Sequence, residues 1–270
     1  TAVHTPQLAD ALQRESPHAA VDAIRLGHGR RITDEEATQA SIRVRQRHGI
    51  PADAVIFGVP GGLTPEKRVR QVLEAFAAVR PHHPQAWLLL AGAPAAHYDV
   101  AADIARLGIG ERTTVTGYVE DDEAFDEYVA ACDVSINLRW PTAREVSGPW
   151  LRALAAGRPT LITDLAHLAH VPALDPRTWQ AHQGTREEPV AVAIDILDED
   201  HSLRLAMRRL AGDVDLRATL GRAGAAYWER HHSLERMAED YRRVIACAIA
   251  RPAPSPELPA HLRADGTARL

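Results

Sequence analysis

The fold of this chain is decided by residues 54–68, which read Ala54-Val-Ile-Phe-Gly-Val-Pro-Gly-Gly-Leu-Thr-Pro-Glu-Lys67-Arg68. The apolar run that opens the stretch has the length of a short buried strand. The residues that follow it are amphipathic, with apolar side chains at helical spacing: Val69, Val72, Leu73, Phe76 and Val79. The stretch therefore predicts a strand, a glycine-rich loop and a helix, in that order.

Lys67 stands out because the chain has 31 lysines and arginines in all, and this residue is its only lysine. Gly61 and Gly62 precede it and let the backbone approach a ligand closely. Thr64 and Pro65 are typical of a helix N-cap and of the first helical position. A helix start offers free N–H groups and a positive dipole end to an anion. The loop therefore predicts a phosphate site, with an ordinary surface lysine as the alternative.

Strand-like and helix-like segments alternate along the neighbouring sequence. We expect strands near residues 87–92, 113–117, 134–138 and 159–163, and helices near residues 33–49, 98–107, 121–132 and 147–156. Such units with short connections predict an α/β fold with a doubly wound parallel sheet, Rossmann-like, covered by helices on both faces. Ligands of these sheets bind beyond the carboxyl ends of the strands, so the loops after Phe57, Thr116 and Leu138 form the candidate site.

The two ends of the chain follow other patterns. We expect a helix over residues 2–15 with Thr5-Pro6 at its start, a short strand over residues 20–26, and a mostly helical region over residues 187–250. Residues 251–270 begin with Arg251-Pro-Ala-Pro-Ser-Pro and are typical of a disordered, Pro-rich tail.

The richest candidate loop is residues 139–152, which read Arg139-Trp-Pro-Thr-Ala-Arg-Glu145-Val-Ser147-Gly148-Pro-Trp-Leu-Arg152. It enters a predicted helix through Ser147 and Gly148, whose N–H groups suit a phosphate. Glu145 is placed to accept hydrogen bonds from hydroxyl groups. Glu145 and Ser147 are also typical helix caps, and the capping and binding roles are compatible.

Composition excludes several classes of protein. A net charge of −5 argues against nucleic acid as the main partner. The sequence shows no signal peptide and no run of about 18 apolar residues, and its two distant cysteines suit a reducing compartment. We therefore expect a cytoplasmic protein, either free or peripheral at the inner face of the membrane. His167 and His170 have helical spacing but no carboxylate or cysteine in a metal-site pattern, so we expect no metal site there.

Three segments, in order, resemble the donor-binding half of a GT-B glycosyltransferase of the retaining family 4 type, also called group 1. The first is Gly61-Gly-Leu-Thr-Pro-Glu-Lys67 with Val72-Leu-Glu-Ala-Phe76. The second joins Leu88-Leu-Leu-Ala-Gly92, Val115-Thr-Gly-Tyr-Val119 and Ala130-Ala-Cys-Asp-Val134. The third is residues 138–157, which end in Ala153-Leu-Ala-Ala-Gly157. The resemblance covers about residues 50–250 and implies the C-terminal half of a GT-B fold, followed by a helical C-terminal region.

The resemblance implies roles for the residues that match the family's motifs. Lys67 would neutralise the donor diphosphate, and Glu145 would hold hydroxyl groups of the donor sugar, which makes these two the expected catalytic residues. Ser147 and Gly148 match a turn whose amides face the phosphates.

The resemblance implies further donor contacts and two departures. Tyr118 and Val119 match a loop that lines the nucleotide base, and Gly61 belongs to the same donor site. Gly62 stands where the family often has a second cation on the diphosphate, and Arg68 is a candidate to replace that charge. Arg152 stands where a second glutamate usually holds the ribose.

The resemblance also implies a division of the chain. Residues 1–50 would be a remnant of an N-terminal acceptor domain with the interdomain linker, and residues 51–232 the nucleotide-sugar donor domain. Residues 233–250 would form a helix that crosses back toward the acceptor domain, and residues 251–270 the tail. The missing acceptor domain would lie in a longer chain or in a partner chain, so we expect this fragment to be inactive alone.

The implied activity is hexosyl transfer from a nucleotide diphosphate sugar to an acceptor glycan or lipid-linked glycan. The resemblance implies retention at the anomeric carbon, no metal or other cofactor, and a place in bacterial cell-surface polysaccharide or glycoconjugate synthesis. Two alternatives stay open: a non-catalytic nucleotide-sugar-binding module or partner subunit, and, more remotely, a sugar-nucleotide epimerase of GT-B shape. Gly62 and Arg152 favour the first alternative, whereas Lys67 and Glu145 favour a working donor site.

Overall fold

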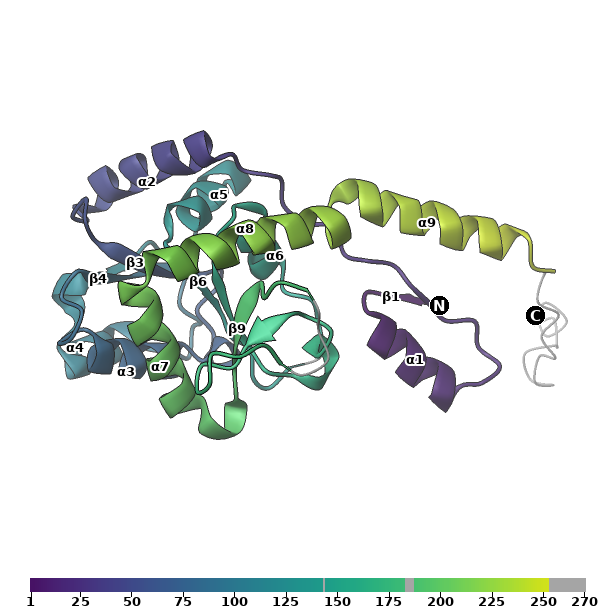
Figure 1. Cartoon of the computed structure of the whole chain (residues 1–270), viewed down its shortest axis with the longest axis horizontal. Helices are drawn as coiled ribbons and strands as arrows, with labels where there is room; N and C mark the ends of the chain where they lie inside the picture. The colour runs from purple at the N-terminus through teal and green to yellow at the C-terminus, as the bar shows by residue number, and fades with distance from the viewer. Residues whose placement is uncertain (143, 183–186, 253–270) are drawn as a thin grey trace, which may run out of the picture.

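The computed structural model of the chain describes residues 1–142, 144–182 and 187–252, so the tail expected over residues 251–270 lies almost wholly outside the described residues. The described part contains a seven-stranded parallel sheet with the strand order β5-β4-β3-β6-β7-β9-β8 (Figure 1). Its strands are β3 (Val55–Pro60), β4 (Ala86–Ala91), β5 (Thr113–Val115), β6 (Val134–Asn137), β7 (Thr160–Thr163), β8 (Ala173–Leu174) and β9 (Ala191–Ile194). The predicted α/β fold with a doubly wound parallel sheet is confirmed.

Helices cover both faces of this sheet. They are α2 (Asp34–His48), α3 (Val69–Val79), α4 (Val100–Leu107), α5 (Asp122–Ala131), α6 (Gly148–Ala155), α7 (Glu199–Gly212) and α8 (Val214–His231). Alternation along β3 explains the two layers, because successive side chains of a strand point to opposite faces. Phe57 packs into the cluster that contains α3 and α7, whereas Ile56 packs against α2 and α5. Every residue of β3 and β4 is buried, as their unbroken apolar runs predict.

The helix boundaries show how much of the fold is encoded locally. Thr33 and Glu36 form the expected capping box, with each side chain bonded to the backbone of the other residue. Gly49 ends α2 in the left-handed conformation, with φ of 64°. Ile32, Ala37 and Ala40 then pack α2 against α5 and α6, so this helix belongs to the sheet body.

The mostly helical region expected over residues 187–250 is confirmed by α7, α8 and a third helix over Leu234–Ile249. Its first part also contains a strand that was not expected, because Ala191–Ile194 form β9, which pairs with both β7 and β8. A run of four apolar residues is too short for its periodicity to distinguish a strand from a helix. Here the run is a strand because it pairs with the edge of β7. The helix expected over residues 2–15 begins at Pro6 with Thr5 as its N-cap, as the Thr5-Pro6 pair indicates, whereas Ala2–Val3 before it form a short strand. Of the strand expected over residues 20–26, only Asp22–Ala23 is formed.

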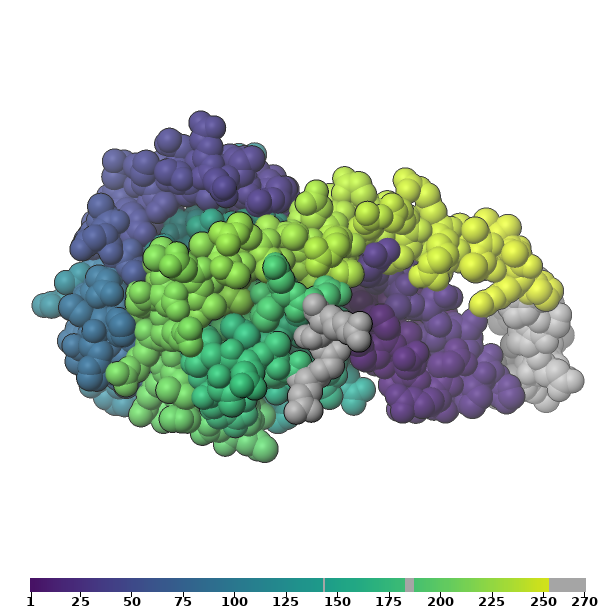
Figure 2. All heavy atoms as spheres, in the orientation of Figure 1, coloured from purple at the N-terminus to yellow at the C-terminus, as the bar shows by residue number. Residues whose placement is uncertain are grey.

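An extension stands beside the sheet body and consists of the first 26 residues together with α9 (Leu234–Ile249). Its other elements are β1 (Ala2–Val3), α1 (Pro6–Glu15) and β2 (Asp22–Ala23), and β1 pairs with β2 in parallel. Figures 1 and 2 show α9 continuing outward from α8 and lying over the purple N-terminal segment. The backbone amide and guanidinium of Arg25 bind Asp240 of α9 and join the two parts of the extension. None of the described helices is both long enough and apolar enough to cross a bilayer.

The strand order reverses direction between β3 and β6. From β3 the chain moves outward to β4 and β5, and it then returns to β6 on the other side of β3. Where the connections after two neighbouring strands run to opposite sides of the sheet, a crevice is left at the carboxyl ends of those strands. The loops after β3 and β6, which the sequence singles out, therefore leave the sheet side by side.

Candidate functional site

A cleft of about 280 Å³ opens at this edge of the sheet. It brings together Gly61 and Gly62 after β3, Tyr118 and Val119 after β5, and Arg152 of α6. These five predicted site residues are far apart in the sequence, and the sheet topology gathers them. The rest of the lining is His28, Ala91, Gly92, Ala93, Asp122, Phe125 and Pro149.

The glycines of this cleft are required by close backbone contacts. Gly61 has a φ of 85°, and a Cβ atom placed there would lie 2.5 Å from Nζ of Lys67. A Cβ atom on Gly92 would lie 2.2 Å from the carbonyl oxygen of Gly61. The backbone N–H of Gly61 also donates to the carbonyl of Ala91, at 2.8 Å. The loops after β3 and β4 are therefore in direct backbone contact, which keeps the floor of the cleft open.

Lys67 lies at the end of a single 3₁₀ turn, Pro65–Lys67, and its ammonium donates to the carbonyl oxygen of Pro60 at 2.7 Å. Burial lowers the pKa of Lys67 to about 8, and the positive charge of Arg139 contributes to the same shift. A cation held in this way is costly without an anion, because both burial and a like charge disfavour its charged form.

The prediction that Thr64 caps the following helix was wrong. The Thr64 side chain makes no capping bond, and helix α3 begins only at Val69. Arg68 adopts the left-handed conformation, with φ of 58°, and this separates the 3₁₀ turn from the helix. The positive charge at this loop therefore comes from Lys67, and the start of α3 lies beyond it at Val69.

Arg139 is a charged residue at this edge of the sheet to which the sequence analysis gave no role. It directly follows β6, and its backbone N–H donates to Oγ1 of Thr163 at 2.9 Å. Its Nε lies 2.9 Å from Oε1 of Glu145. The backbone N–H of Trp140 donates to the carbonyl of Glu66, which ties this loop to the loop of Lys67. The signal in the sequence was an arginine at the carboxyl end of a predicted strand, opposite the only lysine.

Glu145 and Ser147 lie in a small hollow of about 20 Å³ beside the main cleft, together with Arg139 and His167. Oε2 of Glu145 accepts a hydrogen bond of 2.9 Å from the hydroxyl of Thr142, in addition to its ion pair with Arg139. Oγ of Ser147 accepts a bond from the backbone N–H of Trp150 and caps α6. The capping role foreseen for Ser147 is therefore present.

Gly148 is the first residue of α6 and packs close to the His28 ring, so that a Cβ atom there would lie 3.1 Å from two ring atoms. This contact places the start of α6 against the segment that leads out of the extension. The backbone of α6 thus begins at the wall of the main cleft, beside Pro149.

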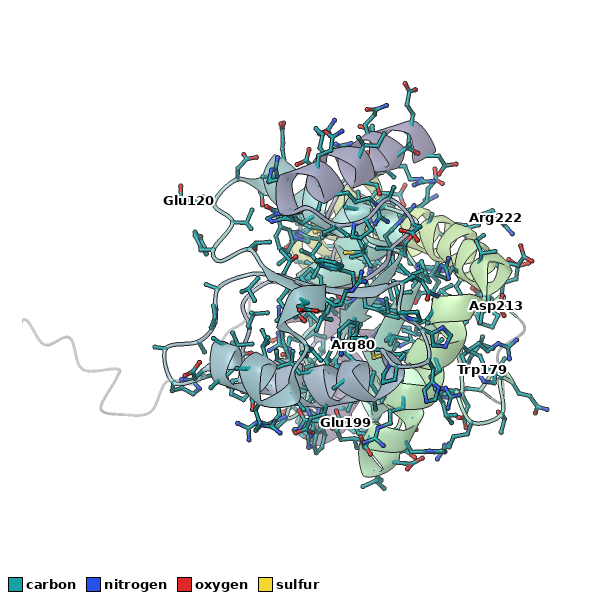
Figure 3. All side chains as sticks on the ribbon, turned by 90° about the vertical axis from the view of Figure 1, so that its left-hand side faces the viewer. Arg80, Glu120, Trp179, Glu199, Asp213 and Arg222 are labelled. Atoms are coloured by element: carbon teal, nitrogen blue, oxygen red, sulfur yellow. The ribbon has the colours of Figure 1, made fainter. Side chains whose placement is uncertain are left out.

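The contacts of Arg68 count against the expectation that it replaces a missing charge on the diphosphate. Its guanidinium forms a fork with Glu199 of α7, with a shortest distance of 2.6 Å between Nη2 and Oε2. Glu199 is the first residue of α7, and Figure 3 labels it. Arg68 is not among the residues that line the cleft. Arg139 is the arginine whose charge acts on Lys67.

Arg152 is held at the other end of the cleft by several partners. Its guanidinium donates to Oδ1 of Asp122 at 2.7 Å and to Oδ1 of Asp126 at 3.0 Å. Its Nε donates to Nε2 of His28 at 3.1 Å, and burial together with Arg152 lowers the pKa of His28. Among the described residues, no group of three or more histidine, cysteine or acidic side chains is arranged to hold a metal ion.

A family model described as "Glycosyl transferases group 1" matches residues 41–209, which is more than half of the chain. The chain belongs to the group 1 glycosyltransferases. The match includes the glycine-rich loop, the hollow that contains Glu145, and every residue that lines the cleft except His28. No curated protein sequence matches this glycosyltransferase significantly.

Solved structures share the fold of this group 1 glycosyltransferase at low sequence identity. Anabaena HepE, in complex with UDP and glucose, is 14% identical, with a TM-score of 0.71 over 93% of this chain and 62% of its own. Sucrose-phosphate synthase from Thermosynechococcus elongatus is 21% identical, with a TM-score of 0.67 over 92% of this chain and 58% of its own. The chain thus spans about three fifths of the length of these relatives.

A C-terminal domain is also among the similar structures. It belongs to the group 1 family glycosyl transferase LpcC from Francisella tularensis and is 14% identical. Its TM-score is 0.56 over 71% of this chain and 92% of its own. The sheet and its two helical layers are therefore the fold found in GT-B glycosyltransferases.

Proposed function

We propose that this chain is the donor-binding part of a retaining glycosyltransferase of the family 4 type, acting on a nucleoside diphosphate sugar. The observation that carries the proposal is the Lys67 ammonium, which is buried at the switch point of the sheet beside a cleft lined by glycine backbone. Its pKa of about 8 marks a charge that lacks compensation in the unliganded protein. A diphosphate is the anion that this family's reaction supplies.

We assign a different role in the proposed reaction to each residue at this edge of the sheet. Lys67 and Arg139 would stabilise the charge that develops on the leaving diphosphate, with the amides at the start of α6 as further donors. Glu145, which is paired with Arg139, would orient the donor sugar by accepting hydrogen bonds from the hydroxyl groups of the sugar. Tyr118 and Val119, which follow β5 and line the same cleft, would face the base.

The acceptor would be bound by a domain outside this sequence, and we expect an acceptor glycan or a lipid-linked glycan in cell-surface polysaccharide or glycoconjugate synthesis. The chain spans only part of its structural relatives, so transfer is proposed for the complete protein. We propose hexosyl transfer without a metal, in the cytoplasm. A nucleotide-sugar-binding module without catalysis is the second candidate, and the engagement of Glu145 with Arg139 and Thr142 favours it.

Calorimetric titration of this chain with UDP, GDP, ADP and their glucose conjugates tests the donor site. UDP is the first probe, because HepE was solved with UDP and glucose. We expect saturable binding of one nucleotide that is lost in Lys67→Met. Arg14→Met, which removes one positive charge from α1 in the extension, is the matched control and should bind normally. Unchanged affinity in Lys67→Met would contradict the proposal.

The Lys67→Met variant also carries its own test of folding. The folded-state pKa lies below the ordinary value of 10.5, so the charged form is disfavoured in the folded protein. That cost is fully present below pH 8 and disappears as the pH rises toward 10.5. Removing the charge should therefore raise the free energy of unfolding at pH 7, by up to about 3 kcal/mol. Denaturant unfolding at pH 7 checks this, and a less stable variant would leave loss of binding without a specific cause.

The two candidate functions differ in the complete protein. Joined to an acceptor domain, a donor domain of a working enzyme should transfer sugar, and Glu145→Gln should lower kcat more than it weakens nucleotide binding. Nucleotide binding without transfer would favour the binding module.

A further inference from the structure

One part of the cleft lining is a wall formed by residues of α5 and α6. Asp122 is in the first turn of α5, and Arg152 is on α6. The Arg152 guanidinium donates to Oδ1 of Asp122 at 2.7 Å and also to its backbone carbonyl at 3.2 Å. Both residues line the cleft, which makes their pair part of any ligand site there.

The two members of this pair differ in their freedom to meet a ligand. The side chain of Arg152 is only 11% exposed and is also bound to Asp126 and His28, with its guanidinium 5.3 Å from the centre of the Phe125 ring. The side chain of Asp122 is 87% exposed. Among the residues that the structure describes, Arg152 donates a hydrogen bond of 2.7 Å to its carboxylate. The carboxylate is therefore the group that this wall offers to a ligand, and Arg152 is the fixed support behind it.

Charge decides which part of a ligand fits here. One guanidinium faces two carboxylates, Asp122 and Asp126, so this wall repels a phosphate group. The Lys67 ammonium lies behind Gly61 of the cleft lining, 2.5 Å from where a Cβ atom on that glycine would be, and the charge of Arg139 acts on Lys67. A nucleoside diphosphate would therefore place its phosphates beside Lys67 and its uncharged part beside Asp122.

The remaining lining of the cleft suits a nucleoside. Ala91, Val119 and Phe125 offer apolar contacts, and Tyr118 has a side chain that is 76% exposed at the same cleft. A carboxylate accepts hydrogen bonds from the adjacent hydroxyls of a ribose, a contact that recurs in nucleotide-binding α/β sheets. We propose that Asp122 recognises the ribose of the donor nucleotide, and that Arg152 is the positioning residue that holds it. This inference rests on the proposed function.

Ribose recognition is tested with the full chain and pairs of nucleotides that differ by one hydroxyl. UDP, GDP and ADP are titrated by calorimetry beside their 2′-deoxy and 3′-deoxy forms. The wild-type chain should bind a ribonucleotide about 10- to 100-fold more tightly than the deoxy form, as expected for a hydrogen bond to a charged group. Asp122→Asn should lose most of this preference and keep its affinity for the deoxy form.

Glu123→Gln is the matched control, because it removes the same charge one residue along and lines a different hollow, between α2 and α5. It should keep the full preference for ribose. An Asp122→Asn variant that keeps the preference would overturn the inference while leaving the donor site intact. Failure of the wild-type chain to bind any of these nucleotides would overturn the donor site and the inference with it.

Arg152→Lys separates positioning from a merely structural role. Lysine keeps the charge but lacks the fork that holds Asp122 and Asp126 together. We expect the preference for ribose to fall about 3- to 10-fold, with unchanged affinity for the deoxy form, because only the hydroxyl contact depends on the position of Asp122. An equal loss of affinity for both forms would show that Arg152 supports the cleft in general and does not position Asp122.

Discussion

The sheet body and the extension are held together by different forces. In the body, Phe57, Phe76 and Leu88 are fully buried within one apolar cluster that joins the sheet to its helices. In the extension, the only buried residue of α9 is Asp240, and the only one of α1 is Ala9. The contact between Arg25 and Asp240, with bonds of 2.7 to 3.0 Å, takes the place of a core there.

The comparison shows that two helices with similar sequence patterns can be held to the protein by different interactions. Helices α3 and α9 both carry a strong apolar stripe, but only the stripe of α3 is covered. Tyr241, Ile245 and Ile249 of α9 are exposed in the described structure. The body therefore depends on apolar area removed from water, whereas the position of the extension depends on a few directional, charged bonds.

The largest expected effect is a loss of core volume in the body. Phe76→Ala should lower the free energy of unfolding by about 3–5 kcal/mol, because it leaves a cavity in a fully buried cluster. Ile249→Ala, an apolar truncation at a residue of α9 that is 79% exposed, should change it by less than about 0.5 kcal/mol. Denaturant unfolding at pH 7 measures both, and similar losses would remove the distinction between the two regions.

Acid should weaken the joint between the regions. The His232 ring lies between α8 and α9 and contacts Trp150 and Tyr227, and its Nδ1 lies 3.0 Å from the carbonyl of Leu26. Burial lowers the pKa of His232 to about 4, from 6.5. The unfolded chain therefore binds more protons between these values, and stability falls as the pH falls through this window.

Between pH 7 and pH 4.5 this acid effect should amount to about 2–3 kcal/mol for the single side chain. It is measured by denaturant unfolding at pH 7 and at pH 4.5, with His232→Gln as the variant that removes the titrating ring. His82→Gln is the control at an exposed histidine. A wild-type dependence on pH that persists unchanged in His232→Gln would assign acid sensitivity to other groups.

A smaller and more local effect is expected at the ion pair of the extension. Asp240→Asn should release α9 from residues 1–26 at a cost of about 1.5–3 kcal/mol, because hydrogen bonds to a charged group are lost. Hydrogen exchange should quicken in α1 and α9 and stay unchanged in the strands of the body. Glu239→Gln, at an exposed neighbour that pairs with Arg236, is the control. Faster exchange throughout the body would show that the two regions unfold as one unit.

The smallest perturbation uses one cysteine in each region. Cys247 is exposed on α9, whereas Cys132 is buried in the body, and burial raises its pKa to about 12. A thiol reagent at pH 8 should modify Cys247 rapidly and Cys132 only when the body opens. Cys247→Ser should leave a single, slow labelling step that follows unfolding of the body. Rapid labelling of Cys132 in this variant would contradict the rigid body.

More of the fold than of the candidate site could be predicted from the sequence. Strands β3 to β7, the helix caps at Thr33 and Ser147, and the order of the site loops follow from patterns of a few neighbouring residues. The lone lysine and the carboxylate of Glu145 were also visible in the sequence. The predicted roles of these site residues stay predictions, because the bound donor is what would test them.

The ion pairs between residues that are distant in the sequence could not be predicted from it. Nothing near Arg68 indicates Glu199, which is 131 residues away, and nothing near Arg152 indicates Asp122, which is 30 residues before it. The same holds for the charge of Arg139 acting on Lys67. Each of these contacts is made by elements that are neighbours only after the sheet has formed.

By itself, the sequence determined the parallel α/β fold, its glycine-rich loop and the edge of the sheet where a ligand would bind. Backbone conformation and capping depend on residues within one turn of each other, so they are readable in order along the chain. The tertiary structure alone decided that residues 191–194 form β9, that Arg68 turns away to Glu199, and that Arg152 holds Asp122 at the cleft. Strand pairing and ion pairing depend on which distant segments pack together, and that is set by burial of the whole core.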